Sequence, residues 1–248
     1  NLPVRVSALV RGKALHYSDY EAFSFSPPRK REHANARSDD EEATASQDAR
    51  VIADKLPLTL DRSGAGKLTI DNVPQARQPQ ELLLEATYAD PNGEVQTIRS
   101  TQTLWPAAVV AGIKTEGWVS ARQKMRFQAL ALQHDGKAAP DTSLQVQAIA
   151  RITTTTRKRM VGGFYSYDNQ TSTKDLGTVC TGKSDSRGLL LCDAKLDEAG
   201  EVELVVTATD RDGNTSEAAS SVWVTRQGEL WFGGEDHDRI DLLPEKKS

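Results

Sequence analysis

Apolar and polar residues alternate with a period of two along much of the chain, and helical periodicity is nearly absent. The alternation is clearest in residues 4–10, 125–130, 144–150 and 202–208. Successive side chains of a strand point to opposite faces, so this period indicates strands with one buried face. Turn-forming sequences separate them at residues 90–93, 134–137 and 212–214. Many short strands between such turns predict an all-β protein made of antiparallel sandwiches.

The strand pattern occurs twice. Asp61-Arg62-Ser63-Gly64 precedes strand-like residues and then residues 81–93, which end in an Asp-rich glycine turn. The order recurs in the second half, where Asp185-Ser186-Arg187-Gly188 precedes residues 203–213. A recurrence at about domain length is typical of tandem domains, so two copies of one domain are predicted.

The boundary between the copies is expected near Leu104-Trp105-Pro106, because proline cannot donate to a strand ladder. This predicts one sandwich over residues 1–105 and a second over residues 106–226. Residues 227–248 are expected to be a linker or the first strand of a further domain. We expect both ends of the chain to be cuts or processing sites within a longer protein.

Residues 27–50 fit no strand. They contain a basic run and an acidic run but no large apolar residue, so they cannot bury enough surface to offset their ordering entropy. A mobile loop in the first domain is therefore predicted. It is interpreted either as a tolerated insertion or as a protease-sensitive or partner-docking loop.

Composition narrows the function classes. Of the 248 residues 38% are hydrophobic, and the net charge is −4, which argues against nucleic acid as a partner. No apolar run approaches the roughly 18–20 residues that a membrane-spanning helix needs. The four histidines are scattered, and no nucleophile elbow, phosphate loop or zinc-binding helix motif occurs. We therefore expect no enzyme activity, no cofactor and no metal site.

Residues 210–217 contain alternating oxygen-bearing side chains that resemble a calcium loop. An EF-hand loop needs glycine at its sixth position, which is Thr215 here, whereas Gly213 comes two residues early. Asp-Gly-Asn is also a common turn, because glycine and asparagine tolerate positive φ. A turn is the favoured interpretation, with calcium binding as the alternative.

The only cysteines, Cys180 and Cys192, flank a turn-forming sequence at residues 183–188. Two strands joined by that turn would bring the cysteines within disulfide reach, although two free thiols are also compatible with the sequence. A disulfide would imply maturation in an oxidising compartment such as a periplasm.

Residues 157–167 are the most distinctive local sequence. Cations are followed by a glycine pair and three aromatics, which gives six candidate partner-binding residues: Arg157, Lys158, Arg159, Phe164, Tyr165 and Tyr167. They form either a binding edge or an architectural feature, in which the glycines bend a long hairpin and the aromatics pack on a neighbouring sheet or domain.

Residues 157–167 resemble the bacterial α2-macroglobulins, and so does the series from Cys180 through Cys192 to Asp210-Arg211-Asp212-Gly213-Asn214. The resemblance covers essentially the whole chain and is least marked in residues 27–50. It implies two tandem macroglobulin-type domains, which are β-sandwiches of fibronectin III/Ig-like type, and a chain end that resembles the start of the bait-region domain. The Cys-x-Glu-Gln thioester motif of many members is absent here.

The resemblance implies a scaffold fragment of a periplasmic, broad-range protease inhibitor that entraps proteases after bait cleavage. The fragment would not inhibit alone, would meet proteases only through the full-length protein, and would reach a membrane only through a lipid anchor elsewhere. One alternative is a binding module that docks a periplasmic or cell-wall-synthesis protein. Another is a surface or adhesin-type array of β-sandwiches.

Overall fold

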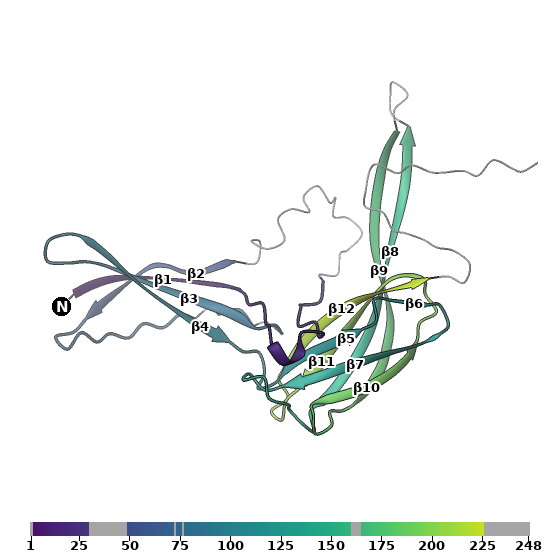
Figure 1. The fold of residues 1–248 in the computed structure, drawn as a ribbon. Helices are drawn as coiled ribbons and strands as arrows, with labels where there is room; N and C mark the ends of the chain where they lie inside the picture. The colour runs from purple at the N-terminus through teal and green to yellow at the C-terminus, as the bar shows by residue number, and fades with distance from the viewer. Residues whose placement is uncertain (1, 30–48, 72, 76, 160–164, 226–248) are drawn as a thin grey trace, which may run out of the picture.

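The computed structural model describes residues 2–29, 49–71, 73–75, 77–159 and 165–225 (Figure 1). The predicted all-β fold is confirmed: one 3₁₀ turn and three sheets make up this part of the chain. No helix in it is long and apolar enough to cross a membrane. The elements are β1 (Leu2–Gly12), η1 (Ser18–Tyr20), β2 (Arg50–Leu60), β3 (Gln80–Ala89), β4 (Val95–Leu104), β5 (Val110–Thr115), β6 (Trp118–Ser120), β7 (Lys124–Leu132), β8 (Ser143–Arg159), β9 (Tyr165–Lys183), β10 (Leu189–Lys195), β11 (Gly200–Thr209) and β12 (Thr215–Thr225).

Strands β1–β4 form one twisted antiparallel sheet in the order β2-β1-β3-β4, which we call the N-terminal unit. The alternation in β1 explains its two faces. Val4, Ala8 and Val10 are buried on one face. The other face carries charge, including an ion pair of Arg11 with Glu81. The sheet is therefore amphipathic, with one apolar side.

The strands of the N-terminal unit supply one layer only. Residues 65–79 follow the Asp61 turn, where the repeat predicts strand-like residues, yet no strand forms in their described part. Prolines at 74 and 79 cannot donate ladder hydrogen bonds, and the alternating stretch before them is short. Gly66 lies close against Leu58 and Leu60, so this irregular segment covers part of the apolar face. The boundaries of the first domain stay a prediction.

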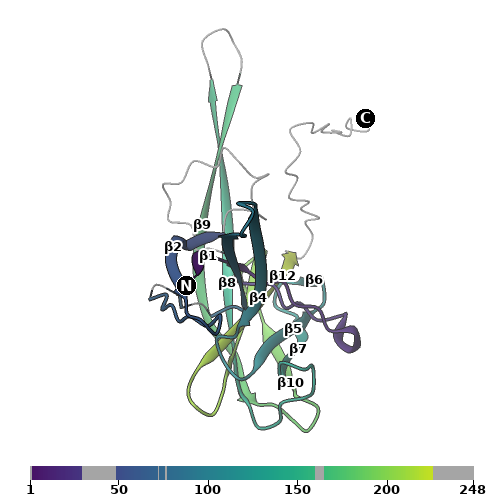
Figure 2. The same ribbon diagram turned by 90° about the vertical axis from the view of Figure 1, so that its left-hand side faces the viewer.

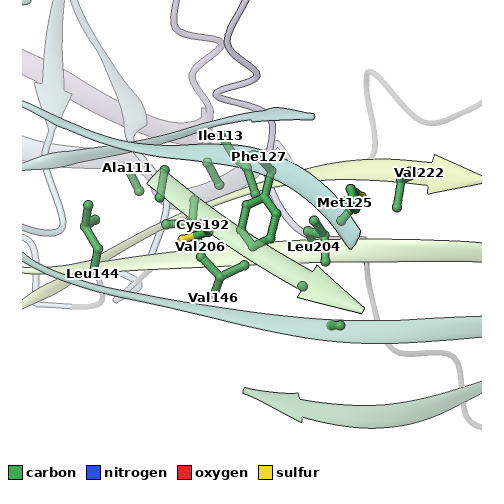
Figure 3. Packing of buried hydrophobic residues seen from close by; sticks show 14 of the residues in the cluster. Ala111, Ile113, Met125, Phe127, Leu144, Val146, Cys192, Leu204, Val206 and Val222 are labelled. Carbon is green, nitrogen blue, oxygen red and sulfur yellow. The ribbon is translucent and has the colours of Figure 1, made fainter. Parts of the chain in front are cut away.

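Strands β5–β12 form a two-layer sandwich, here called the sandwich. One sheet has the order β10-β7-β5 and the other β6-β12-β11-β8-β9. Alternate residues of each strand point between the layers, as the pattern predicts, and Figure 3 shows Phe127, Met125, Leu204 and Val206 packed there. This interior is the larger apolar core of the described residues.

Four turns share one hydrogen-bond pattern, and each begins with an aspartate: Asp61, Asp90, Asp185 and Asp210. In each, the aspartate Oδ1 accepts backbone N–H groups from the second and fourth residues after it. The third residue after it is a glycine with φ between 78° and 85°, a region that L-residues rarely adopt. The Asp-x-x-Gly repeat thus encodes a turn.

Cys180 and Cys192 form a disulfide with a Cα–Cα distance of 6.0 Å. The two strands are not the hairpin that the sequence suggested, because β9 and β10 belong to different sheets. The Asp185 turn carries the chain from one layer to the other. The disulfide therefore joins the two layers of the sandwich, and Figure 3 shows Cys192 among the buried core residues.

The tail at residues 227–248 and most of the predicted mobile loop, residues 30–48, lie outside the described residues. The described ends of that loop are residues 27–29 and residues 49–50, the last of which begins β2.

Candidate functional site: the strap and the ribbon

Residues 13–29, which we call the strap, leave β1 and run across to the sandwich (Figure 1). Ser24 and Ile113 of β5 exchange two backbone hydrogen bonds of 2.7 and 3.0 Å. The Ser26 carbonyl accepts the Ala219 N–H of β12 at 2.8 Å, and Ser24 Oγ donates to the Ala219 carbonyl at 2.7 Å. One short segment thus bonds to the edge strand β5 of one layer and to β12 of the other, and it ties the N-terminal unit to both sheets.

Two aromatic residues of the strap lie close to the β5–β7 sheet. Phe25 contacts Gly112, where an added Cβ would lie 2.7 Å from the ring, and Tyr17 comes close to Gly136 in the same way. The rings meet edge to face at 5.0 Å. The chain neighbours of Val110, Val109 and Ala111, belong to the core, so Val110 and its partner Leu132 lie on the outer face of the sheet. Val110 is nevertheless fully buried. The outer face of this sheet is therefore also covered, whereas the outer face of an isolated sandwich would be exposed to water.

A buried ion pair receives the end of the strap. Arg151 of β8 and Glu203 of β11 are bonded at 3.0 Å, with side chains only 7% and 3% exposed. The other Glu203 oxygen accepts the Arg29 N–H at 2.8 Å, and the Arg29 guanidinium pairs with Glu201 at 2.7 Å. Buried charges need partners for each oxygen, so the strap backbone helps satisfy the Glu203 carboxylate.

The passage from β4 into β5 is held by a second group of contacts. Trp105 stacks on His134 with ring centroids 4.1 Å apart, and His134 Nε2 lies 2.7 Å from the Ala107 carbonyl oxygen. Asp210 Oδ2 accepts the Ala108 N–H at 2.9 Å. This bond, with those from Asn214 and Asp212, holds the pKa of Asp210 below its ordinary value. The carboxylate oxygens of Asp210 are thus engaged in structural bonds.

The calcium alternative gains no support at this turn. No group of three or more His, Cys, Asp or Glu residues that could hold a metal ion occurs in the described part of the chain. Of the four scattered histidines, His134 has the structural contacts just described, and residues 33 and 237 lie outside the described residues.

The second feature is a projecting two-stranded ribbon. Pairing of β11 with β8 ends at Glu201 and Arg151, but β8 and β9 stay paired from Ile152 with Ser172 to Arg159 with Tyr165. We call residues 152–159 and 165–172 the ribbon, which extends well beyond the sandwich (Figures 1 and 2). A Thr153–Thr171 hydroxyl contact of 3.2 Å joins its strands. An isolated ribbon is marginally stable in water, so its length is unusual.

The ribbon holds five of the six predicted partner-binding residues. Arg157 pairs with Tyr167 and Arg159 with Tyr165, so the register places these four residues on one face. Lys158 pairs with Ser166 and falls on the opposite face. Phe164 lies outside the described residues. Whether the five bind a partner stays a prediction.

Sequence reasoning missed the strap as a separate structural element. Its aromatic residues at 17, 20, 23 and 25 were the available signal, because such a cluster between two strands seldom stays exposed. Their partners, Gly112 and Gly136, carry no side chain that a pattern could have revealed.

No protein-family model matches the chain, and no curated protein sequence matches it. Among solved structures, the chain is similar to native Escherichia coli α2-macroglobulin, with 16% identity and a TM-score of 0.55 over 95% of this chain and 14% of that one. It is also similar to the methylamine-reacted Salmonella α2-macroglobulin, at 15% identity and a TM-score of 0.54 over 90% of this chain and 14% of that one. It is similar as well to the E. coli protein activated by porcine elastase, at 17% identity and a TM-score of 0.51 over 92% of this chain and 19% of that one.

Because these identities are low, the matches establish the fold alone. The chain spans about one seventh of the length of the first two proteins, at 14% each. Nine tenths or more of this chain is matched to each. The chain therefore has the fold of a segment of the bacterial α2-macroglobulins.

Proposed function

We propose that this chain is a structural segment of a longer, exported protein of the α2-macroglobulin kind, in which it holds two consecutive β units in a fixed relation. Such a protein would entrap proteases in the periplasm, and the chain alone would neither inhibit nor catalyse. The observation that carries the proposal is the match to solved α2-macroglobulins over 90% or more of the chain.

The contacts of the strap support a scaffold role. They join the N-terminal unit to both layers through backbone bonds, aromatic packing and the bond from the Arg29 N–H to the buried Glu203, and such features resist relative motion. The disulfide between the layers adds a constraint suited to a compartment without cytosolic reductants.

The test is a protease assay with the isolated chain. The chain is incubated in excess with elastase, and cleavage of a large protein substrate and a small peptide substrate is followed. We expect both rates to be unchanged and no covalent adduct on a denaturing gel. Loss of either activity, or an adduct, would contradict the proposal. A protease-trapping protein containing this chain should protect only the large substrate, because entrapment excludes large molecules.

A second candidate function is partner docking through the ribbon. The observation that favours it is the placement of Arg157, Arg159, Tyr165 and Tyr167 on one face of a segment that leaves the sheet. Arginine and tyrosine are enriched at interface hot spots. The candidate partner is an acidic periplasmic or cell-wall-synthesis protein.

The ribbon provides its own matched control. Capture of periplasmic proteins by the immobilised chain is compared for Arg157→Glu and Lys158→Glu, which make the same charge change on opposite faces. Docking predicts that Arg157→Glu loses a specific band and Lys158→Glu keeps it. Equal behaviour of the two variants would rule this candidate out.

A further inference from the structure

Each sheet edge presents unpaired backbone groups that can pair with another chain, and natural proteins usually protect such edges. Most edges in the described residues are protected. Ser24 covers β5, β6 is three residues long, and the disulfide ties β10 to β9. Within the sandwich, the pairing of β9 with β8 contains two irregularities, whereas the ribbon beyond it is open along both edges. Outside the ribbon, these features leave the two edges of the N-terminal unit to compare.

One of these edges, β2, carries several protective features. Its pairing with β1 has two register irregularities, Lys55 has a φ of 49°, and Pro57 lacks an N–H. Bulges, prolines and lysines are the usual means of blocking edge-to-edge pairing. A second strand is therefore poorly accommodated along β2.

The other edge, β4, has none of these features. It pairs with β3 without irregularity from Gln80–Leu104 to Ala89–Val95, and it contains neither proline nor glycine. Residues 95–102 are all exposed, and Ile98 is 61% exposed on the face shared with the apolar residues Ala86 and Val6. This is a straight, open strand with an apolar residue near its middle.

The charge on β4 is compatible with self-pairing. Its single charged residue, Arg99, is ion-paired to Glu85 of β3 at 2.9 Å. Two antiparallel β4 strands centred on Ile98 would set Ile98 against Ile98 and Arg99 against Thr97, so no like charges would face each other. Apolar β-branched residues in direct opposition stabilise a strand pair.

We propose that β4 is an interaction surface on which a second copy of this chain pairs antiparallel, joining two four-stranded sheets into one. The geometry is two-fold symmetric, as in most homodimers. The contact is small, so the expected dissociation constant is on the order of tens of micromolar, in the range of weak, transient interfaces. The proposal does not depend on the function proposed above.

The test is sedimentation velocity of the whole chain over a wide concentration range. We expect a concentration-dependent dimer that Ile98→Lys weakens at least about tenfold, because two lysines would then face each other across the pair. The matched control is Val51→Lys, since Val51 is 60% exposed on the blocked edge strand β2. This variant should dimerise like the wild type. Circular dichroism verifies that both variants fold.

Cross-linking locates the contact independently. Both native cysteines are already bonded, so an introduced cysteine reacts alone. Ile98→Cys should form a disulfide-linked dimer on mild oxidation, and Val51→Cys should not. A wild-type chain that stays monomeric throughout overturns the proposal, as does equal loss of association in the two lysine variants.

Discussion

Gly112 allows the strap to lie against the sandwich. Its missing side chain leaves room for the Phe25 ring, which would otherwise meet a Cβ at 2.7 Å. Phe25 cannot easily move away, because it packs against Tyr17 and lies between residues that bond to both sheets.

Gly112→Ala should therefore lower the free energy of unfolding by about 1–3 kcal/mol, the usual cost of overpacking. Urea denaturation measures it. Gly117→Ala is the control, because its added Cβ would meet nothing within 4 Å. That variant should be neutral or slightly stabilised, since alanine restricts the unfolded chain. If both variants lost the same free energy of unfolding, contact with Phe25 would not be the reason why position 112 needs glycine.

Asp210 connects stability to pH. The N–H of Ala108 and the bonds within the turn hold its pKa below the ordinary value. Asp185 also has a lowered pKa, caused chiefly by the Leu189 N–H. A carboxylate with a depressed folded pKa stabilises the fold above its unfolded pKa, and this contribution disappears as pH falls through the folded pKa.

Asp210→Asn should flatten the loss of stability between neutral pH and about pH 3, because the amide does not titrate. Urea midpoints at several pH values measure the slope. If the slope of Asp210→Asn equals that of the wild type, the bonds that Asp210 accepts do not contribute to stability in solution.

At the scale of elements, the disulfide joins the layers at the point where the chain crosses from β9 to β10. Cys180 and Cys192 are separated by 12 positions. Chain-entropy arguments for a loop of this size give a stabilisation of about 3 kcal/mol.

Replacing both cysteines by alanine should thus lower the free energy of unfolding by about 2–4 kcal/mol. Reductant should destabilise the wild type by a similar amount and leave the double variant unaffected. If reductant shifts both proteins equally, or neither, the bond does not stabilise the sandwich.

The positions of the strands were more predictable from the sequence than which strands pair in a sheet. The alternation in β1, β7, β8 and β11 marks the face that each strand turns to a core, so it is visible in the sequence, although β11 also buries Glu203 and Val205 on its other face. The Asp185 turn was interpreted as a hairpin because its residues fix only the local bend, and the same bend also carries a chain between sheets. The ribbon was recognisable as strand from its β-branched threonines, but where it leaves the sheet depends on where β11 ends.

At the scale of the whole molecule, the sequence predicted two β units but not the strap that joins them. That contact depends on residues far apart in the chain, such as Phe25 with Gly112 and Arg29 with Glu203, and no local period records it. We infer that these contacts hold the N-terminal unit and the sandwich in one fixed arrangement.

The distance between the two units tests that claim directly. Spin labels are attached to cysteines replacing Asp54 in β2 and Asp193 in β10, which is possible because both native cysteines are bonded. Pulsed electron resonance on dilute protein then gives the distance distribution. We expect one narrow distribution in the doubly labelled chain, which should broaden with Gly112→Ala and not with Gly117→Ala. A broad or multi-peaked distribution in the wild type would contradict it.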